Sequence, residues 1–331
     1  MSVTIKDVAK AAGVSVATVS RVLNKKANIS DAAIEAVNTA VDELGYSPNF
    51  LGRDLRKCET RRILAIIAST EHSFYSEVIR GMQETAFKSG YDVLIGTTDD
   101  EPDHEMRLLN MLFSRSVDAA VLLGPKLDVQ TINKLGKNYN LALCIERLDD
   151  CELLTVTIDN IAAAYDAVKC LINKGSRKVA MISTSIRSQS SIDREIGYKR
   201  ALEESGIPFR DEYLYQGTYD SISGEEAVGN FLSLPDPPTA IFAVSDHLAM
   251  GAIRRSISRG KKVGKDIQIM GFDDITYSQM FIPSISTVRQ PLYLQGVTVI
   301  KELLENLTNP VKKDDLIMLS HELVLRSSTG D

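Results

Sequence analysis

The first 45 residues contain three groups of apolar residues at helical spacing, separated by turn residues. The segment Thr4-Ile-Lys-Asp7 is a capping signal, because a threonine before a helix and an acidic residue three positions later can bond to each other's backbone. It predicts a short helix that ends at about Ala11. Gly13 then supplies a tight turn, so a second helix can start in a new direction.

This second helix is expected to begin at Ser15 and to run from Val16 to about Asn24. Ser30 caps a third predicted helix, which ends at the C-cap residue Gly45. The apolar positions of the third helix share one face, and they are Ile34, Val37, Val41 and Leu44. Helix, glycine-containing turn and helix is the layout of the DNA-binding helix-turn-helix, so we expect an all-α headpiece.

Beyond residue 62 the pattern changes to short apolar runs that alternate with helical stretches. The predicted strands are residues 63–68, 91–95, 119–123, 141–145, 178–182, 240–244 and 267–270. Strands that alternate with helices form parallel sheets covered on both faces, so the fold class of this part is α/β. Residues 154–160 are expected to link two similar, doubly wound lobes, and residues 288–291 and 317–325 to cross back between them.

This organisation predicts four parts of the chain. They are a helix-turn-helix headpiece (1–46), a hinge helix and linker (47–60), an amino-terminal sensor lobe (61–159 with 289–319) and a carboxy-terminal sensor lobe (160–288 with 320–331). In open parallel sheets, ligands bind beyond the carboxyl ends of the strands. With two lobes, both sets of strand ends are expected to point at one cleft.

Composition narrows the class of protein. The chain of 331 residues is 44% hydrophobic and 25% charged, which is ordinary for a folded globular protein. No apolar run approaches the roughly 18 residues that span a bilayer, and the amino terminus has no hydrophobic signal core, so we expect a cytoplasmic protein without membrane contact. Cys58, Cys144, Cys151 and Cys170 show no metal-binding or disulfide spacing. We expect reduced thiols, no metal and no cofactor.

Charge and the outer face of the second helix both point to DNA. The net charge is −6, yet residues 1–62 carry ten Lys or Arg and seven Asp or Glu, so a basic head precedes an acidic body. An arginine such as Arg21 can pair bidentately with guanine, and Val16 and Ala17 can contact a thymine methyl. Hydroxyl and amide side chains suit backbone contacts, and here they are Ser15, Ser20, Asn24 and Ser30. The alternative is a three-helix bundle packed against its own protein.

The segments TIKDVAKAAGVSVATVSRVLN and LGYSPNFLGRDL resemble the headpiece of the LacI/GalR family of repressors, and the resemblance extends over essentially the whole chain. It implies that Val16, Ala17 and Arg21 read bases and that Thr4, Tyr46 and Asn49 hold phosphates. It also implies two lobes of periplasmic-binding-protein type and a sugar-like small-molecule effector. The expected partner is double-stranded operator DNA, bound by a homodimer.

The hinge of this family becomes helical on DNA and wedges a leucine into the minor groove. Leu55 stands at that position, and Arg53 lies in a basic stretch that adds electrostatic affinity. The family usually has alanine where this chain has Gly52. The predicted DNA-binding residues are Thr4, Ser15, Val16, Ala17, Ser20, Arg21, Asn24, Asn28, Ser30, Tyr46, Asn49, Gly52, Arg53 and Leu55.

The predicted strand ends supply a candidate effector site. Asp273 follows a buried run, where a carboxylate can accept hydrogen bonds from two sugar hydroxyls, and Arg194 lies in the segment that carries the family's ligand arginine. Ser245 stands where sugar-responsive relatives often have Asn or Asp. Phosphosugars, nucleosides or a phosphoprotein partner, as in a catabolite-control-type regulator, therefore stay open. The predicted effector-binding residues are Phe74, Tyr75, Arg147, Arg194, Tyr219, Ser245 and Asp273.

Some neighbouring side chains have structural alternatives. Asp246 precedes a predicted helix and is expected to be its N-cap rather than a ligand. Asp159 is expected to be structural, and Asp274 to cap or brace the next loop. Tyr75 is as well suited to the core as to the cleft.

An enzyme is not expected. The four histidines, His72, His104, His247 and His321, lack metal-ligand spacing, and no nucleophile elbow, phosphate loop or dinucleotide-binding glycine motif occurs. A free-standing solute-binding protein would have a signal peptide and no DNA-reading head. The chain ends without the leucine-heptad tail of tetrameric relatives, so a dimer is expected. Its operator affinity should change with closure of the cleft, by induction or by corepression.

Gly52 leads to a test of the predicted hinge. Because glycine costs about 1 kcal/mol relative to alanine inside a helix, Gly52→Ala should make the hinge helix easier to form. We expect the full-length variant to bind operator DNA roughly fivefold more tightly than the wild type. Equilibrium binding of both proteins to the same duplex checks this, and equal affinities would show that hinge folding does not limit binding.

Overall fold

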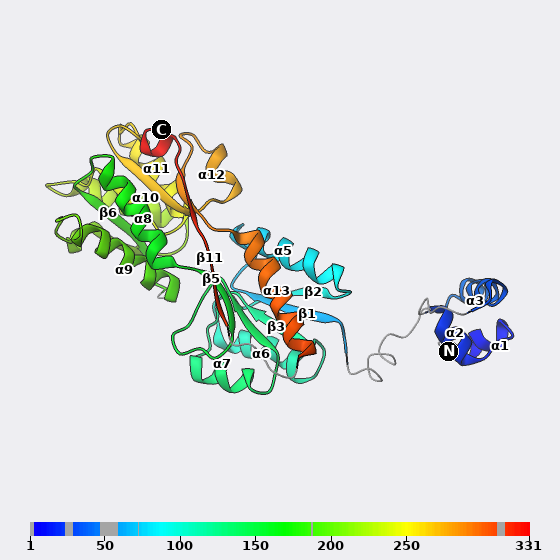
Figure 1. Ribbon diagram of the computed structural model, residues 1–331. Helices are drawn as coiled ribbons and strands as arrows, with labels where there is room; N and C mark the ends of the chain where they lie inside the picture. The colour runs from blue at the N-terminus through cyan, green and yellow to red at the C-terminus, as the bar shows by residue number, and fades with distance from the viewer. Residues whose placement is uncertain (1–2, 24–28, 47–58, 72, 187, 310–314) are drawn as a thin grey trace. The chain divides into compact units, whose positions relative to one another are not determined.

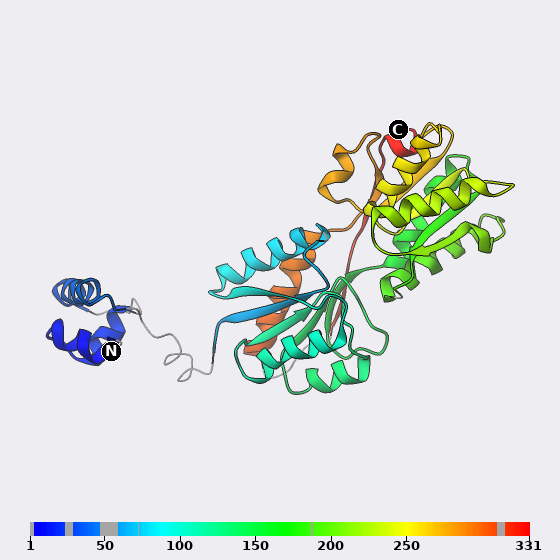
Figure 2. The ribbon, with the colours of Figure 1, turned by 180° about the vertical axis from the view of Figure 1, so that it is seen from behind.

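The computed structural model describes residues 3–23, 29–46, 59–71, 73–186, 188–309 and 315–331. The chain divides into two compact units, Met1–Glu59 and Thr60–Asp331. Among its described residues the first unit has three α-helices, and the second unit holds two sheets with helices on their faces (Figures 1 and 2).

The headpiece consists of α1 (Ile5–Ala11), α2 (Val16–Leu23) and α3 (Asp31–Leu44). The carboxylate of Asp7 accepts hydrogen bonds from the backbone N–H of Thr4 at 2.8 Å and from its hydroxyl at 2.7 Å. Gly13 and Gly45 have φ angles of 65° and 59°, as the turn and the C-cap require. The three predicted helices are therefore confirmed.

The headpiece core is small and comes from all three helices. Its buried residues are Val8, Ala9, Val19, Val22, Val37 and Ala40. The predicted apolar face of α3 is only partly correct, because Ile34 and Leu44 are 37% and 36% exposed while Ala40 is buried.

The amino-terminal lobe is built on a parallel sheet with the strand order β11-β5-β4-β3-β1-β2. Its strands are β1 (Arg62–Ile67), β2 (Asp92–Thr97), β3 (Ala119–Leu122), β4 (Leu141–Cys144), β5 (Leu154–Ile158) and β11 (Leu316–Leu319). Its helices are α5 (Phe74–Lys88), α6 (Pro102–Phe113), α7 (Val129–Gly136) and α13 (Leu292–Thr308). Ile63 and Ala65 of β1 pack with α5 and α13, and Leu64 packs with α6 and α7, so both faces of the sheet are covered.

The carboxy-terminal lobe has the strand order β12-β10-β9-β8-β6-β7, and only β12 runs antiparallel to its neighbour. Its strands are β6 (Val179–Thr184), β7 (Leu214–Gly217), β8 (Ala240–Ala243), β9 (Gln268–Asp273), β10 (Ser286–Arg289) and β12 (Glu322–Val324). Its α-helices are α8 (Asn160–Asn173), α9 (Gln189–Glu203), α10 (Ser221–Ser233), α11 (Asp246–Ser258) and α12 (Thr276–Met280). Two short 3-10 helices, η1 (Asp211–Tyr213) and η2 (Ser327–Thr329), complete this lobe.

The chain passes between the lobes three times: from β5 to α8, from β10 to α13, and from β11 to β12. All seven predicted strands are present, but the segment expected only as a link also contains the fully buried strand β5. The strand β7 was not predicted, because its sequence Leu-Tyr-Gln-Gly offers no continuous apolar run and is only partly buried. The short return strands β10, β11 and β12 lie where crossings were expected.

Two glycines allow α5 and α13 to pack closely. A Cβ at Gly81 would lie 2.2 Å from the carbonyl oxygen of Tyr293, and one at Gly296 would lie 2.1 Å from that of Val78. Both clashes involve backbone atoms, which cannot rotate away. The pair therefore keeps α5, whose first turn holds Phe74 and Tyr75, at a fixed distance from α13.

This packing predicts that Gly81→Ala lowers the free energy of unfolding by about 1–3 kcal/mol or more, because the methyl group forces the helices apart. Gly229→Ala on α10 is the matched control, since its Cβ would meet no atom closer than the Arg255 side chain at 3.6 Å. We expect the control to be neutral or more stable by up to about 1 kcal/mol. Urea unfolding of both variants makes the comparison, and equal stabilities would contradict the close-packing account.

Candidate functional sites: a headpiece face and an interlobe cavity

The first turn of α2 forms the accessible face of the headpiece. Ser15, Val16, Ala17 and Arg21 are exposed, and Ser20 is half-buried. Ser15 also caps α2, because its hydroxyl accepts a hydrogen bond from the backbone N–H of Thr18 at 3.1 Å. An exposed helix face with small side chains in its first turn and Arg21 in its last turn has the shape and the positive charge that DNA recognition uses.

The remaining predicted DNA-binding residues have varied surroundings. Tyr46 is half-buried against the headpiece core, and Ser30 is exposed at the start of α3. The backbone N–H and the hydroxyl of Thr4 both donate to the carboxylate of Asp7, so a phosphate at Thr4 would have to compete with that carboxylate. Predicted residues that lie outside the described part of the chain are Asn24, Asn28, Asn49, Gly52, Arg53 and Leu55.

A cavity of about 410 Å³ lies between the lobes, at the carboxyl ends of strands from both sheets. Its amino-terminal-lobe wall is formed by Ala68, Phe74, Tyr75, Asp100, Leu123, Gly124, Pro125, Lys126, Ile145, Glu146 and Leu148. Its carboxy-terminal-lobe wall is formed by Ile186, Ser188, Gln189, Ser190, Arg194, Tyr219, Ser245, His247 and Asp273. Six of the seven predicted effector residues lie on these walls, and Arg147 does not.

Asp273 and Arg194 face this cavity from buried positions. Asp273 ends β9 with a φ of 109°, is 7% exposed, and accepts a hydrogen bond from Nε2 of Gln290 at 2.8 Å. Burial raises the pKa of Asp273 to about 8, although the positive charge of Arg194 opposes this shift. A buried carboxyl in a strained backbone conformation is typical of a binding site rather than of a structural brace.

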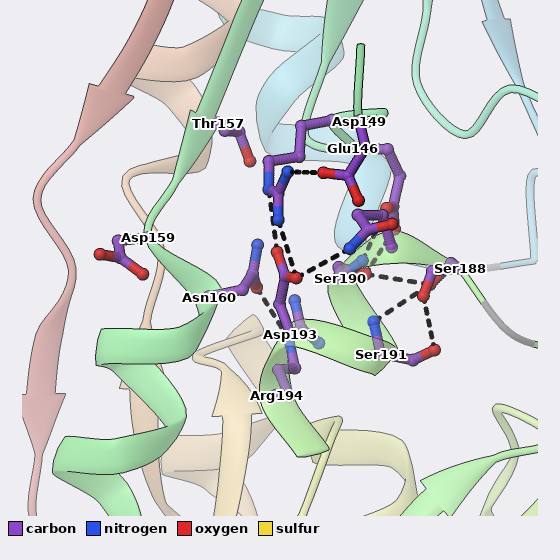
Figure 3. Close-up of polar contacts among 12 residues, drawn as sticks. Glu146, Asp149, Thr157, Asp159, Asn160, Ser188, Ser190, Ser191, Asp193 and Arg194 are labelled. Atoms are coloured by element: carbon purple, nitrogen blue, oxygen red, sulfur yellow. Dashed lines mark hydrogen bonds and ion pairs between the residues drawn. The ribbon is translucent and has the colours of Figure 1, made fainter. Parts of the chain in front are cut away.

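The guanidinium of Arg194 is held on three sides. Its Nε donates to Oδ1 of Asn160 at 2.9 Å (Figure 3). Its Nη1 donates to the carbonyl of Val244 at 2.7 Å, and the group stacks over the Phe272 ring at 3.7 Å. These contacts leave other guanidinium donors available, since arginine carries five N–H groups. The side chain is thus fixed before any ligand arrives.

The aromatic wall comes from both lobes. Phe74 and Tyr75 form an edge-to-face pair with ring centroids 5.3 Å apart at the start of α5, and Tyr219 lies across from them in the other lobe. Burial raises the pKa of both tyrosines. Tyr75 also packs against the lobe core, so its two predicted roles coincide.

The structure corrects the assignment of the cap of α11. Ser245 is the N-cap, because its hydroxyl accepts from the N–H of Leu248 at 3.3 Å. Asp246 lies within the helix and is fully buried, where its carboxylate accepts hydrogen bonds from the Ile275 N–H, the Ser278 hydroxyl and the Thr287 hydroxyl. Burial raises its pKa to about 6. The expected N-cap role of Asp246 was therefore wrong, and this residue braces three segments of the lobe.

Two other aspartates behave as expected. Asp159 caps α8 by accepting from the N–H of Ala162 at 2.9 Å. Asp274 forms ion pairs with Arg289 at 2.7 Å and Arg326 at 2.8 Å, so it braces its loop.

Arg147 points away from the cavity and crosses to the other lobe. Its guanidinium forms an ion pair with Asp193 and a second one with Asp149. The carboxylate of Asp193, which the sequence did not single out, takes up the donors that a ligand would have used. The effector role of Arg147 is therefore replaced by an interlobe contact.

Several polar wall residues are not among the seven predicted effector-binding residues. Asp100 and Lys126 form an ion pair at 2.6 Å, and Glu146 accepts hydrogen bonds from Ser190. All three follow strand ends of the amino-terminal lobe, so the rule that located the cleft also applies to them. The buried Glu105 holds the Lys126 loop by accepting from the backbone N–H groups of Lys126 and Leu127, and burial raises its pKa.

The described residues contain no group of three His, Cys, Asp or Glu side chains that could hold a metal ion. Over the same residues, no helix is both long enough and apolar enough to cross a membrane. Cys144 and Cys170 are free thiols.

Comparison with protein families agrees with the two parts of the chain. Residues 4–49 match the family model described as bacterial regulatory proteins of the lacI family, and residues 60–323 match the model of periplasmic binding proteins and the sugar binding domain of the LacI family. Among curated proteins, catabolite control protein A of Priestia megaterium is 35% identical over 99% of this chain and 100% of its own length. The transcriptional repressor CytR of Escherichia coli K12 is also 35% identical, over 98% of this chain and 96% of its own.

Solved structures show the same architecture. The lac repressor dimer bound to operator and the anti-inducer ONPF superposes with a TM-score of 0.89 at 25% identity, covering 99% of both chains. The complex of the transcriptional regulator CelR with cellobiose has a TM-score of 0.74 at 27% identity, covering 98% of this chain and 99% of its own. Fold and sites thus define a DNA-binding transcription regulator with a two-lobed effector domain.

The chain belongs to the LacI family. Members of this family are DNA-binding regulators and not enzymes, and they combine a helix-turn-helix headpiece with lobes of periplasmic-binding-protein type.

The raised pKa of Asp273 predicts a pH dependence of stability. The folded protein keeps this proton up to about pH 8, whereas the unfolded chain loses it near pH 4. The stability contributed by protonated Asp273 is therefore lost as the pH rises toward 8, by at most about 1.4 kcal/mol per pH unit. Asp273→Asn is the same size and does not titrate. In urea unfolding between pH 6 and pH 9, the wild type should lose stability relative to this variant up to pH 8 and level off above it. Parallel curves would show that Asp273 is already ionised.

Proposed function

We propose that this protein is a transcriptional repressor whose operator affinity is changed by a small, uncharged, polyhydroxylated effector bound between the sensor lobes. The observation that carries the proposal is the cavity itself, whose wall combines Asp273 and Arg194 with the aromatic rings of Phe74, Tyr75 and Tyr219. The anti-inducer-bound lac repressor and the cellobiose-bound regulator CelR, both of the same fold, support an effector of this kind. Binding and release of an unchanged ligand, without catalysis, is the proposed role of the cavity.

Charge favours a neutral ligand. The wall carries the carboxylates of Asp100 and Glu146 against the cations Lys126 and Arg194, while Asp273 keeps its proton up to about pH 8. Lys126 is already paired with Asp100. A phosphate group would therefore find no excess of positive charge, whereas sugar or nucleoside hydroxyls can donate to the carboxylates. The rings of Phe74, Tyr75 and Tyr219 suit the apolar face of a sugar or a base.

We infer that the headpiece reads operator DNA through Val16, Ala17 and Arg21, with Ser15, Ser20 and Ser30 on the backbone. The exposed first turn of α2 supports this assignment, because that part of a recognition helix enters the major groove. The proposed parts of the chain are the headpiece 1–46, the hinge 47–60 and two lobes with the divisions expected from the sequence. A protein that acts on operator DNA works in the cytoplasm.

A homodimer fits both the DNA and the surface. Reading a twofold-symmetric operator requires two headpieces related by a twofold axis. The carboxy-terminal lobe exposes a run of large apolar side chains around α12, with Tyr277 at 56%, Met280 at 69% and Ile282 at 87% exposure. We assign this run to the contact with a second copy, in line with the dimeric lac repressor of the same fold.

Arg21 provides the test of operator recognition. Selection from random duplexes by the full-length protein should yield a twofold-symmetric sequence. Arg21→Ala should weaken binding to that sequence by about 1–3 kcal/mol, roughly 5- to 150-fold, with little change on unrelated duplexes. Lys10→Ala removes the same charge from α1 and is the matched control, expected to act weakly and equally on all duplexes. Recovery of no common sequence, or equal effects of the two variants on it, would contradict the proposal.

A further inference from the structure

Two consecutive residues of the amino-terminal lobe reach across to the other lobe beside the cavity. Glu146 and Arg147 follow β4, and they meet Ser190 and Asp193 in the first turns of α9 (Figure 3). All four residues lie in the described part of the chain, and each of these contacts joins two protein groups.

The arginine contact is a two-point ion pair. Nε of Arg147 donates to Oδ2 of Asp193 at 3.0 Å, and Nη2 donates to Oδ1 at 2.9 Å. The side chain of Asp193 is 3% exposed and that of Arg147 is 24% exposed, so water screens the pair poorly. Nε2 of Gln189 donates to the same carboxylate at 2.9 Å, which fixes its orientation. Parallel hydrogen bonds between arginine and a carboxylate add geometric specificity to the charge attraction.

The glutamate contact lies next to the ion pair. Oε2 of Glu146 accepts from the backbone N–H of Ser190 at 3.0 Å, and Oε1 accepts from the Ser190 hydroxyl at 2.5 Å. The N–H of Ser190 lies at the start of α9, where backbone donors have no partner within the helix. A carboxylate at this place is stabilised by the helix dipole.

The backbone before Glu146 is held in a strained form that aims both residues across the gap. Ile145 has a φ of 75°, which is costly for a β-branched residue. Its N–H donates to the carbonyl of Val156 at 2.8 Å, and its own carbonyl accepts from the Thr157 hydroxyl at 2.5 Å. Strain of this kind persists only where the surrounding contacts determine the conformation.

We propose that Glu146, Arg147, Ser190 and Asp193 form an interlobe clasp that holds the two lobes together in the arrangement described here. Both residues of the ion pair have a sequence neighbour on the cavity wall. Glu146 lies on the cavity wall next to Arg147, and Arg194 lies on it next to Asp193. Loss of the ion pair would therefore also loosen the adjacent contact between Glu146 and Ser190.

An effector in the cavity would compete with Ser190 for the carboxylate of Glu146, a consequence that rests on the proposed function. A hydroxyl that bonds to Glu146 shares its oxygens with Ser190, so ligand binding and clasp geometry are coupled. An effector shifts the arrangement of the lobes only by the difference in its affinity for the two states. The clasp contributes to the free-energy difference between the two arrangements that the effector has to change.

The N–H of Ser190 is itself the reporter of the clasp, since it is bonded across the lobes. We expect Asp193→Asn, in the full-length effector-free protein, to speed hydrogen exchange of the Ser190 amide at least tenfold. The change is isosteric and keeps an acceptor for Gln189, so the lobe should stay folded. Asp149→Asn is the matched control. It neutralises the second carboxylate that pairs with Arg147, and Asp149 lies in the same lobe as this arginine.

Residue-resolved exchange decides the proposal without an effector or an operator. The clasp is supported if Asp193→Asn exposes Ser190 selectively, while the core amides of Met181 and Ile182 keep their rates and Asp149→Asn has no effect. It is overturned if Ser190 exchange is unchanged, if both variants act alike, or if Ser190 and the core amides accelerate together. The last result would mean that Asp193 acts only on global stability. The proposed function is tested by separate measurements of DNA binding and effector binding, so its failure can be distinguished from failure of the clasp.

Discussion

Five ionisable side chains of Asp, Glu, Lys and Arg lie on the wall of one cavity, and the need to give each of them a polar partner determines the contacts around it. Asp100 pairs with Lys126, Glu146 with Ser190, Arg194 with Asn160 and the Val244 carbonyl, and Asp273 with Gln290. A buried charge without a partner is strongly destabilising. Because most of these partners join segments distant in sequence, the charges that suit the cavity for a ligand also organise the lobes.

The sequence predicted the architecture because its signals are local. Capping at Thr4 and Asp7, the left-handed glycines Gly13 and Gly45, and the apolar runs of the parallel strands each depend on a few neighbouring residues. The strand β7 was missed because Gln216 and Gly217 lie at a sheet edge, where burial is incomplete and no apolar run is required. Exposure of Ile34 on α3 was missed because periodicity gives a face but not the width of the core that covers it.

Six of the seven predicted effector residues lie on the cavity wall, and Arg147 does not. The rule that ligands lie beyond strand ends placed Asp273, Arg194 and the aromatic residues on the cavity wall. This rule does not predict the direction of a long side chain that follows a strand end. Arg147 follows β4 as expected, but its direction depends on Asp193, 46 residues away in the chain. Likewise, only the tertiary structure shows that Ser245 caps α11 while Asp246 turns inward to three donors.

The central claim is that occupancy of the interlobe cavity and affinity for operator DNA are coupled. The most direct test takes an effector found by a thermal-shift screen of sugars and nucleosides and measures its dissociation constant with and without saturating operator. The account predicts a ratio of about 5- to 150-fold, equal to the ratio by which the same effector changes the operator dissociation constant. An effector that competes for this cavity yet binds free and operator-bound protein with equal affinity would contradict it.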